Sequence, residues 1–242
     1  MKLTTLATHL SPIIPLLRCP KCGSTVTLEQ DRSLVCENRH CYDLSAKGYA
    51  NLAPSRDQNT DKYNAALFES RSAIFNAGFY APIAQALCAA VKRHHTGVQR
   101  SYKTIQPSVT PDASASFTSP IVLDAGCGEG YYTRALCDAI PNATVIGGDL
   151  SRDAIIAAAR QAHETPWLVA DLTRLPLADG CIDALIDVLT PADYREFARV
   201  LHPDGLLYKV IPADDYLTEI RSAIASHLAD ANFSNARVLE HL

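Results

Sequence analysis

The chain lacks any long apolar run. None of its 242 residues belongs to a stretch of roughly 18 consecutive apolar residues, the length that a membrane-spanning helix needs. The first residues also lack the charged-then-apolar pattern of a secretory signal peptide. Hydrophobic residues make up 48% of the chain and charged residues 20%, which is the balance of a soluble globular protein. We therefore expect a cytoplasmic protein with no membrane partner.

Acidic side chains are few in one half of the chain and abundant in the other. Residues 1–120 contain 13 Lys and Arg against 8 Asp and Glu, a net charge of +5. Residues 121–242 contain 9 against 18, a net charge of −9. The basic half is the better candidate to meet a polyanion.

The eight cysteines are unevenly used. Four stand singly in stretches that predict regular elements: Cys88, Cys127, Cys137 and Cys181. Such scattering fits buried thiols in a reducing compartment. The other four lie near the N-terminus, and three of them, together with a histidine, have the spacing of a metal site, C-x2-C followed by C-x3-H. The candidate ligands are Cys19, Cys22, Cys36 and His40.

Two short strands predicted at Thr25–Leu28 and Ser33–Val35 would form a hairpin that returns the second ligand pair to the first. Thiolates and imidazole suit tetrahedral zinc, and a full set of protein ligands leaves no open position, which indicates a structural role. So small a hairpin buries too little apolar surface to fold alone, and metal binding would supply the missing energy. Cys41 follows His40 directly and is the alternative fourth ligand; we favour His40.

Glycine is scarce, yet three of the 11 glycines fall in one short stretch, at positions 126, 128 and 130. An apolar run, Ile121–Leu123, predicts a buried strand ending at Asp124, and a helical pattern begins at Tyr131. Glycines allow a tight turn and close approach to a ligand, and the helix directs free N–H groups at the same place. The dinucleotide fingerprint G-x-G-x-x-G fails because Tyr131 replaces its third glycine. The D-x-G-x-G-x-G that is present resembles motif I of the class I S-adenosylmethionine (SAM) methyltransferases.

Two further carboxylates follow predicted strands. Asp149 ends the apolar run Thr144–Gly148, where an acidic residue suits the hydroxyl groups of a ribose. Asp171 follows the third strand, where its carboxylate would accept a hydrogen bond from the adenine amino group. Asp187, on the fourth strand, and the Thr190–Pro191 turn lie where a proton acceptor would be needed, although Asp187 is as well explained by a structural role.

Strands and helices alternate from residue 121 onward, which predicts an α/β fold with a parallel sheet and ligands at the carboxyl ends of its strands. The predicted strands lie near 121–125, 144–148, 167–170, 182–189 and 206–211. The predicted helices lie near 64–77, 80–95, 130–140, 151–163, 193–201 and 214–229. Only 31 residues follow the fifth strand, so the methyltransferase fold is expected to be C-terminally shortened, with an exposed edge strand.

The predicted organisation has four parts. Residues 1–54 form a zinc ribbon, 55–95 a helical connector, 96–120 a linker rich in Ser, Thr and Pro, and 121–242 the methyltransferase domain.

Taken together, the ribbon, the helical pair and the glycine loop resemble the bacterial 23S rRNA (guanine-N1)-methyltransferases, including members linked to macrolide resistance. The likeness covers about residues 18–220 apart from the linker. The matching stretches are Cys19-Pro-x-Cys22, Cys36-x3-His40, Lys47-Gly48-Tyr49-x-Asn51-Leu52, Arg71-x5-Ala77-Gly78-x-Tyr80 and Asp124-x-Gly126-Cys-Gly128-Glu129-Gly130-Tyr131-Tyr132-Thr133.

This resemblance implies a ribbon that helps to recognise a 23S rRNA stem-loop, a SAM-binding Rossmann-like domain and a homodimer. It also implies cofactor contacts from Tyr80, Glu129, Gly130 and Tyr216. Tyr42, Tyr49 and Tyr80 are candidate stacking faces for RNA bases, but packing in the protein core is the alternative that we favour for them. The alternatives are a SAM-dependent methyltransferase of a small molecule and an inert homologue that only binds SAM or RNA.

Overall fold

The computed structural model describes residues 2–53, 65–95, 119–161, 164–213 and 218–223. Its helical elements are α1 (Leu3–Leu10), the 3-10 helix η1 (Ser11–Leu16), α2 (Ala65–Asn76), α3 (Ala81–His95), α4 (Tyr131–Ala139), α5 (Arg152–Ala159), α6 (Tyr194–Val200) and α7 (Thr218–Ala223). Its strands are β1 (Val26–Glu29), β2 (Ser33–Cys36), β3 (Cys41–Ser45), β4 (Tyr49–Asn51), β5 (Ile121–Ala125), β6 (Thr144–Asp149), β7 (Trp167–Val169), β8 (Ile182–Val188) and β9 (Leu201–Val210).

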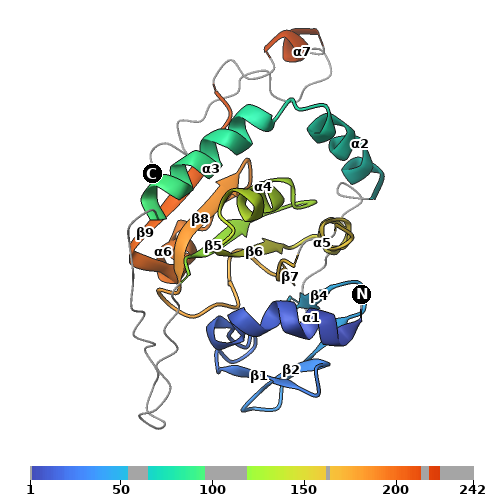
Figure 1. Ribbon diagram of the computed structural model, residues 1–242, viewed down its shortest axis with the longest axis vertical. Helices are drawn as coiled ribbons and strands as arrows, with labels where there is room; N and C mark the ends of the chain where they lie inside the picture. The colour runs from blue at the N-terminus through green and yellow to red at the C-terminus, as the bar shows by residue number, and fades with distance from the viewer. Residues whose placement is uncertain (1, 54–64, 96–118, 162–163, 214–217, 224–242) are drawn as a thin grey trace.

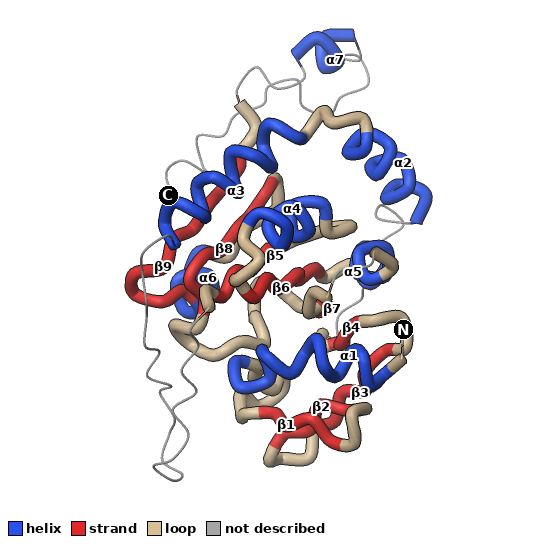
Figure 2. Tube along the Cα trace, viewed as in Figure 1, coloured by secondary structure: helices blue, strands red, loops and turns tan. Residues whose placement is uncertain are grey.

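The strands form one sheet in the order β1-β2-β3-β4-β7-β6-β5-β8-β9 (Figures 1 and 2). The strands from β4 to β9 in this order pair in parallel, whereas β1 to β4 form an antiparallel meander. Parallel pairing requires crossover connections, which α4 and α5 provide between β5, β6 and β7. The chain order therefore reverses at β5, and the glycine loop follows that strand, where ligands of such sheets bind.

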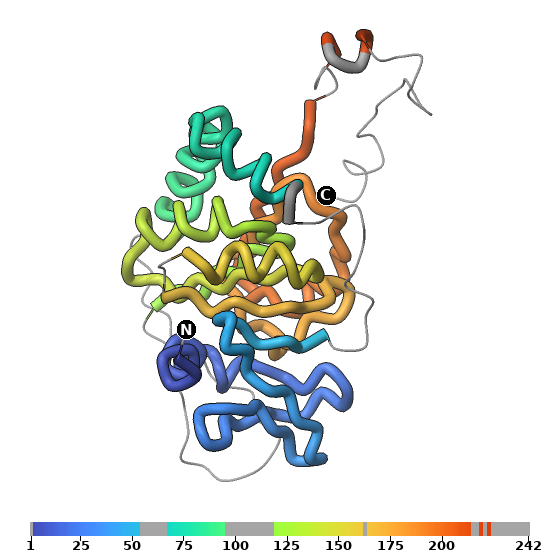
Figure 3. The backbone as a smooth tube through the Cα atoms, turned by 90° about the vertical axis from the view of Figure 1, so that its right-hand side faces the viewer, coloured from blue at the N-terminus to red at the C-terminus, as the bar shows by residue number. Residues whose placement is uncertain are grey.

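The N-terminal meander is continuous with the central sheet. β4 pairs in parallel with β7, with Ala50 opposite Leu168 and Asn51 opposite Val169. Figure 3 shows the blue N-terminal segment stacked directly against the strands of the C-terminal half. The predicted domain boundary at residue 54 therefore falls just after a strand that belongs to the shared sheet.

Helices cover both faces of the sheet because successive strand residues point to opposite sides. Val122 of β5 packs with α3 and α4, while Leu123 faces the opposite side. That second side also receives α1, η1 and α6 together with the apolar side of the meander. One hydrophobic core thus joins the N-terminal meander to the central sheet.

Most predicted elements are present, with shifted ends. The strand predicted at 206–211 begins earlier, since β9 starts at Leu201. The helix predicted at 214–229 is described only as α7, and nearly all of the 96–120 linker lies outside the described residues. α1 and η1 were not predicted, although Leu6, Leu10 and Ile13 are almost fully buried. Within the described ranges no single helix is long and apolar enough to cross a membrane; α2 and α3 pass that test only when taken together across a 78° bend.

Candidate functional site

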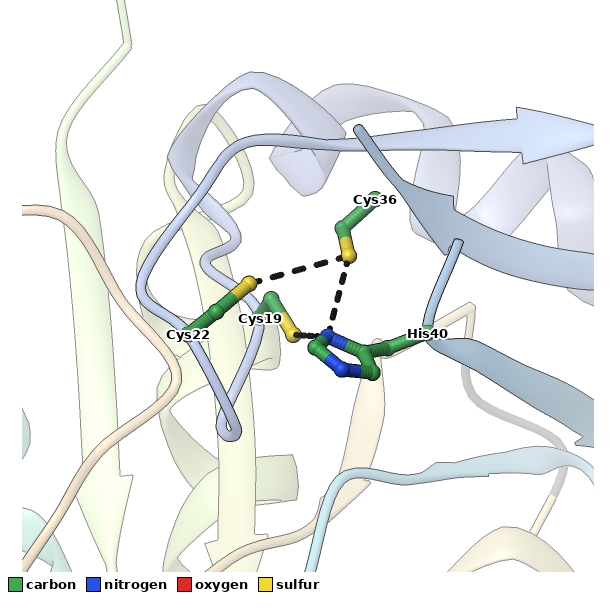
Figure 4. Close-up of side chains that lie close together, drawn as sticks. All are labelled: Cys19, Cys22, Cys36 and His40. Atoms are coloured by element: carbon green, nitrogen blue, oxygen red, sulfur yellow. Dashed lines mark hydrogen bonds between the residues drawn. The ribbon is translucent and has the colours of Figure 1, made fainter. Parts of the chain in front are cut away.

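Four ligand-type side chains converge where the chain enters the meander (Figure 4). Their ligand atoms all lie within 4.8 Å of one another, and the residues are Cys19, Cys22, Cys36 and His40. The Nδ1 atom of His40 is 3.5 Å from Cys19 Sγ and 3.4 Å from Cys36 Sγ, and the Sγ atoms of Cys22 and Cys36 are 3.7 Å apart. Tetrahedral zinc with Zn–S bonds of about 2.3 Å separates neighbouring sulfurs by about 3.8 Å. The donor set and its spacing therefore fit a closed, structural zinc site.

Local turns build this cluster. The Gly23 N–H donates to the Cys19 carbonyl at 2.8 Å, in a turn that needs the positive φ of 77° at Gly23. The second turn is analogous, with the Arg39 N–H donating to the Cys36 carbonyl at 2.8 Å and a φ of 60° at Arg39. Each turn directs its two ligands to one point.

The alternative fourth ligand points elsewhere. Cys41 opens β3 with an exposed side chain, and its Sγ lies 3.9 Å from Asp43 Oδ1. The structure thus groups His40, rather than Cys41, with the three thiols. At Cys22, hydrogen bonding with Ser24 and Asn38 lowers the thiol pKa to about 5, which favours the thiolate that binds metal.

The glycine loop has the backbone that its sequence predicts. Gly126, Gly128 and Gly130 have φ values of 78°, 56° and 77°. A Cβ at Gly126 would lie 2.5 Å from the Thr190 side chain, and one at Gly130 would lie 2.5 Å from the Trp167 ring. Two of the glycines are therefore required by both conformation and space.

Asp149 organises the loop from the end of β6. Its Oδ2 accepts the Gly128 N–H at 2.9 Å and its Oδ1 accepts the Ser151 N–H at 2.7 Å. Burial raises the pKa of this carboxyl, while the two backbone N–H groups oppose that rise. Each carboxylate oxygen has a second lone pair, so Asp149 can still accept hydrogen bonds from ribose hydroxyls.

A cavity of about 610 Å³ opens at the carboxyl ends of the strands, lined by residues of the glycine loop and of α2. Such a volume is ordinary for a small-molecule or cofactor site. Five of the predicted cofactor residues line it: Tyr80, Gly126, Gly128, Asp149 and Asp171. Asp171 already accepts the N–H and the hydroxyl of Thr173 through its Oδ1.

The other predicted cofactor residues lie elsewhere. Asp124 is 1% exposed beneath the loop and accepts a hydrogen bond from Thr133 Oγ1 at 2.6 Å. Glu129 is 2% exposed, and its backbone carbonyl accepts a hydrogen bond from Arg134. Gly130 caps the start of α4, and Tyr216 falls outside the described residues. The side chains of Asp124 and Glu129 do not line the cavity, so direct cofactor contact by these side chains stays a prediction.

Sequence reasoning missed a wall of the cavity. One face of α2 lines it with Phe68, Arg71 and Phe75, which are spaced at i, i+3 and i+7. Arg71 belongs to a stretch that carries the family resemblance, and this spacing was the available signal. The turn after β8 lines the cavity through Leu189, Thr190 and Pro191.

Asp187 holds that turn rather than facing the cavity. Its Oδ2 lies 2.7 Å from Lys209 Nζ, and its Oδ1 accepts the Thr190 N–H at 3.3 Å. Lys209 also donates to the Thr190 carbonyl. Leu189 is held at a φ of 57°, rare for a side-chain-bearing residue, and remains 42% exposed. Asp187 therefore has the structural role rather than that of a proton acceptor.

Two of the three candidate stacking tyrosines are buried. Tyr42 is 8% exposed, with its hydroxyl 3.2 Å from Cys19 Sγ, and Tyr49 is 6% exposed. For these two rings the structure therefore supports the favoured alternative, packing in the core, because both face the core from strands of the meander. Tyr80 lines the cavity, where its ring lies edge-on to Phe75 with centroids 5.1 Å apart.

The parallel sheet, the glycine loop at its reversal point and the adjoining cavity define a class I SAM-dependent methyltransferase that carries an N-terminal zinc ribbon. Residues 122–205 match the family model described as "Methyltransferase domain", and residues 17–60 match that described as "RlmA, N-terminal". A crystal structure of an S-adenosyl-L-methionine-dependent methyltransferase from Methanococcus maripaludis superposes with a TM-score of 0.51. It covers 77% of this chain and 85% of its own, at 16% identity, which shows the fold alone.

Similar proteins with curated names indicate which family of methyltransferases the chain belongs to. A Bacillus subtilis protein named as a 23S rRNA (guanine-N(1)-)-methyltransferase is 34% identical over 93% of this chain and 74% of its own length. A Streptomyces fradiae protein, 23S rRNA (guanine(748)-N(1))-methyltransferase, is 29% identical over 88% of this chain and 69% of its own. The chain belongs to the 23S rRNA (guanine-N1)-methyltransferase family.

Proposed function

We propose that this protein transfers a methyl group from SAM to N1 of a guanine in a stem-loop of 23S rRNA. One observation carries the proposal: the strands of the family-specific zinc ribbon belong to the same sheet whose strand ends border the cofactor cavity. The relatives' names supply the substrate. Because ribosomal RNA is made and modified in the bacterial cytoplasm, cytoplasmic action follows from the same proposal.

The cavity residues suggest a division of roles. When bound, SAM supplies an electrophilic methyl group on its sulfonium. We assign Asp149 to the ribose hydroxyls and Asp171 to the adenine amino group, since both carboxylates line the cavity. The glycine loop lets the backbone approach the cofactor closely, and Tyr80 closes the opposite wall. Holding donor and acceptor aligned supplies much of the rate of a displacement reaction.

The acceptor guanine would enter beside the turn after β8. A base within a stem-loop must leave its stack to reach a cavity, and RNA loops permit this. Leu189 and Ile74 both line the cavity, and at 42% and 47% exposure they offer apolar surface there. With Asp187 paired to Lys209, we assign the acceptance of the N1 proton to the backbone of this turn or to water.

The ribbon is proposed to contribute to RNA recognition, and the four-part division of the chain and the homodimer remain predictions. The N-terminal half of the chain, which contains the ribbon, has a net charge of +5, and this charge supports contact with RNA by that half.

Methyl transfer from radiolabelled SAM to unmethylated 23S rRNA, with mass-spectrometric mapping, tests the proposal. A single N1-methylguanosine in a stem-loop is the expected product. Incorporation only into small molecules would favour the alternative substrate class. SAM binding without any transfer would favour an inert homologue. RNA affinity should fall steeply with salt, because phosphate contacts release counterions.

A further inference from the structure

Arg71 occupies an unusual place in the cofactor cavity. Among the described residues that line the cavity, Arg71 is the only one with a cationic side chain. The carboxylates that line it, Asp149 and Asp171, lie at the ends of β6 and β7. The cavity wall is therefore acidic on the side of those two strands and basic where α2 crosses the glycine loop.

The guanidinium is held over the loop by one ion pair and by cation–π contacts with two rings. Its Nε lies 3.3 Å from Glu129 Oε1 in an ion pair. Its Cζ lies 5.8 Å from the centroid of the Phe68 ring and 5.5 Å from that of Phe75, within the range of cation–π attraction. The side chain keeps 40% exposure. These contacts hold the group without burying it.

The Nη edge of Arg71 lies where Gly128 leaves room. A Cβ built on Gly128 would be 3.5 Å from Nη2 and 3.9 Å from Nη1. Since Nε faces Glu129, the two Nη groups form the edge of the fork beside the loop. That edge matches the geometry of a carboxylate, which arginine binds with two parallel hydrogen bonds.

Glu129 is an unusual partner for a surface ion pair. Its side chain is 3% exposed, and neither carboxylate oxygen has a hydrogen-bond donor among the described residues. A buried carboxylate so poorly satisfied indicates a constraint other than stability. The position of Glu129 beside Arg71 indicates such a constraint: the carboxylate holds the guanidinium over the loop.

We propose that Arg71 binds the α-carboxylate of the cofactor's methionine portion, and that Glu129 is the positioning residue that orients its guanidinium. This inference rests on the proposed SAM-dependent function. It assigns α2, an element outside the methyltransferase family match at 122–205, to cofactor recognition. Side chains of opposite charge would then bind two parts of the cofactor: Asp149 would bind the ribose and Arg71 the amino-acid end.

Two ligands distinguish binding of the amino-acid portion by Arg71 from a general effect of Arg71 on the cavity. S-adenosylhomocysteine carries the amino-acid portion, whereas 5′-methylthioadenosine keeps the adenosine and thioether but lacks it. Calorimetry on the full chain gives the dissociation constant of each ligand. Arg71→Ala should weaken S-adenosylhomocysteine binding by about 10- to 100-fold, the usual effect of losing charge-assisted hydrogen bonds. Binding of 5′-methylthioadenosine should change less than about 3-fold, because no contact to it is lost.

Further variants keep the test decisive. Arg71→Lys keeps the charge and much of the packing but loses the fork, so it should show a smaller loss of the same selectivity. Glu129→Gln should reduce the preference for S-adenosylhomocysteine without affecting 5′-methylthioadenosine. Arg160→Ala removes an exposed cation at the end of α5 and should leave both affinities unchanged.

Equal loss of both ligands in the Arg71 variants would overturn the proposal and reassign Arg71 to the architecture of the cavity. Unchanged affinities would overturn it as well. The outcome is independent of catalysis: wild-type binding of S-adenosylhomocysteine without rRNA methylation would defeat the proposed substrate and leave this inference standing. Failure of the wild type to bind S-adenosylhomocysteine would defeat both.

Discussion

The metal cluster and the cofactor cavity are built in contrasting ways. The cluster takes its four side chains from residues 19–40, and two tight turns aim them at one point. The cavity takes its walls from α2, the glycine loop, the ends of β6 and β7 and the turn after β8. A motif of close ligands can be read from spacing, whereas walls drawn from distant segments require the fold. The two sites nevertheless share one core, since the meander packs with residues of β5, β6 and β8.

Removing zinc should have the largest effect on protein stability, and it tests whether the metal cluster and the cofactor cavity depend on each other. Structural zinc contributes about 10 kcal/mol or more to small zinc domains, so a chelator or Cys22→Ser should unfold the ribbon. Because β4 pairs with β7, we expect the loss to spread to the cavity. Trp167, the only tryptophan and 1% exposed in β7, reports on this through its fluorescence. A red shift on chelation shows coupling.

Unchanged emission of Trp167, together with lost β-structure in circular dichroism, would show instead that the two regions unfold separately. Cys41→Ser is the matched control, because Cys41 is also exposed but lies outside the cluster. That variant should keep its zinc.

Breaking the ion pair behind the cavity should have the next largest effect. Lys209→Met leaves Asp187 buried at 0% exposure without its cation, which costs about 3–5 kcal/mol. Chemical denaturation measures this loss. The double variant Lys209→Met/Asp187→Asn should recover much of it, since no unpaired charge remains. A single variant as stable as the wild type would show that the pair does not hold the Thr190 turn.

Substitutions in the glycine loop should reduce stability by a smaller amount. Gly130→Ala combines a φ of 77° with a Cβ 2.5 Å from the Trp167 ring, and we expect about 1–3 kcal/mol of destabilisation with altered Trp167 emission. Gly180→Ala has a φ of 62° but its nearest contact is 3.9 Å away. Gly180→Ala is therefore the control, with a similar backbone strain but without the steric contact. Equal losses of stability in both variants would assign the effect to backbone strain alone.

A more gradual effect, spread over several pH units, is a dependence of stability on pH. Burial raises the pKa of Asp124 to about 7, against an unfolded value of about 3.9. The folded state therefore binds more protons between pH 4 and 7, and Asp124 makes stability fall as pH rises through this window, by at most about 1.4 kcal/mol per pH unit. Asp124→Asn should remove this contribution. Denaturation at several pH values gives the free energy of unfolding as a function of pH. The same pH dependence in the wild type and in Asp124→Asn would contradict the prediction.

Much of the fold follows from sequence patterns because its signals are local. The predicted strand at 121–125 and the helices at 64–77 and 80–95 agree closely with β5, α2 and α3. α1 escaped prediction because its burial comes from contacts with distant strands. For Tyr42 and Tyr49 the sequence left both base stacking and core packing open, because a short strand does not reveal which of its faces the core will cover.

The amino-acid sequence alone determined the three thiol ligands of the metal cluster, the glycine loop and the order of strands and helices, because each depends on spacing or backbone conformation within a few residues. Tertiary structure decided the rest. It grouped His40 rather than Cys41 with the three thiols, paired Asp187 with Lys209 across neighbouring strands, and brought Arg71 onto the glycine loop. These contacts join residues far apart in the chain, and only packing of the whole sheet and its helices brings them within hydrogen-bond distance.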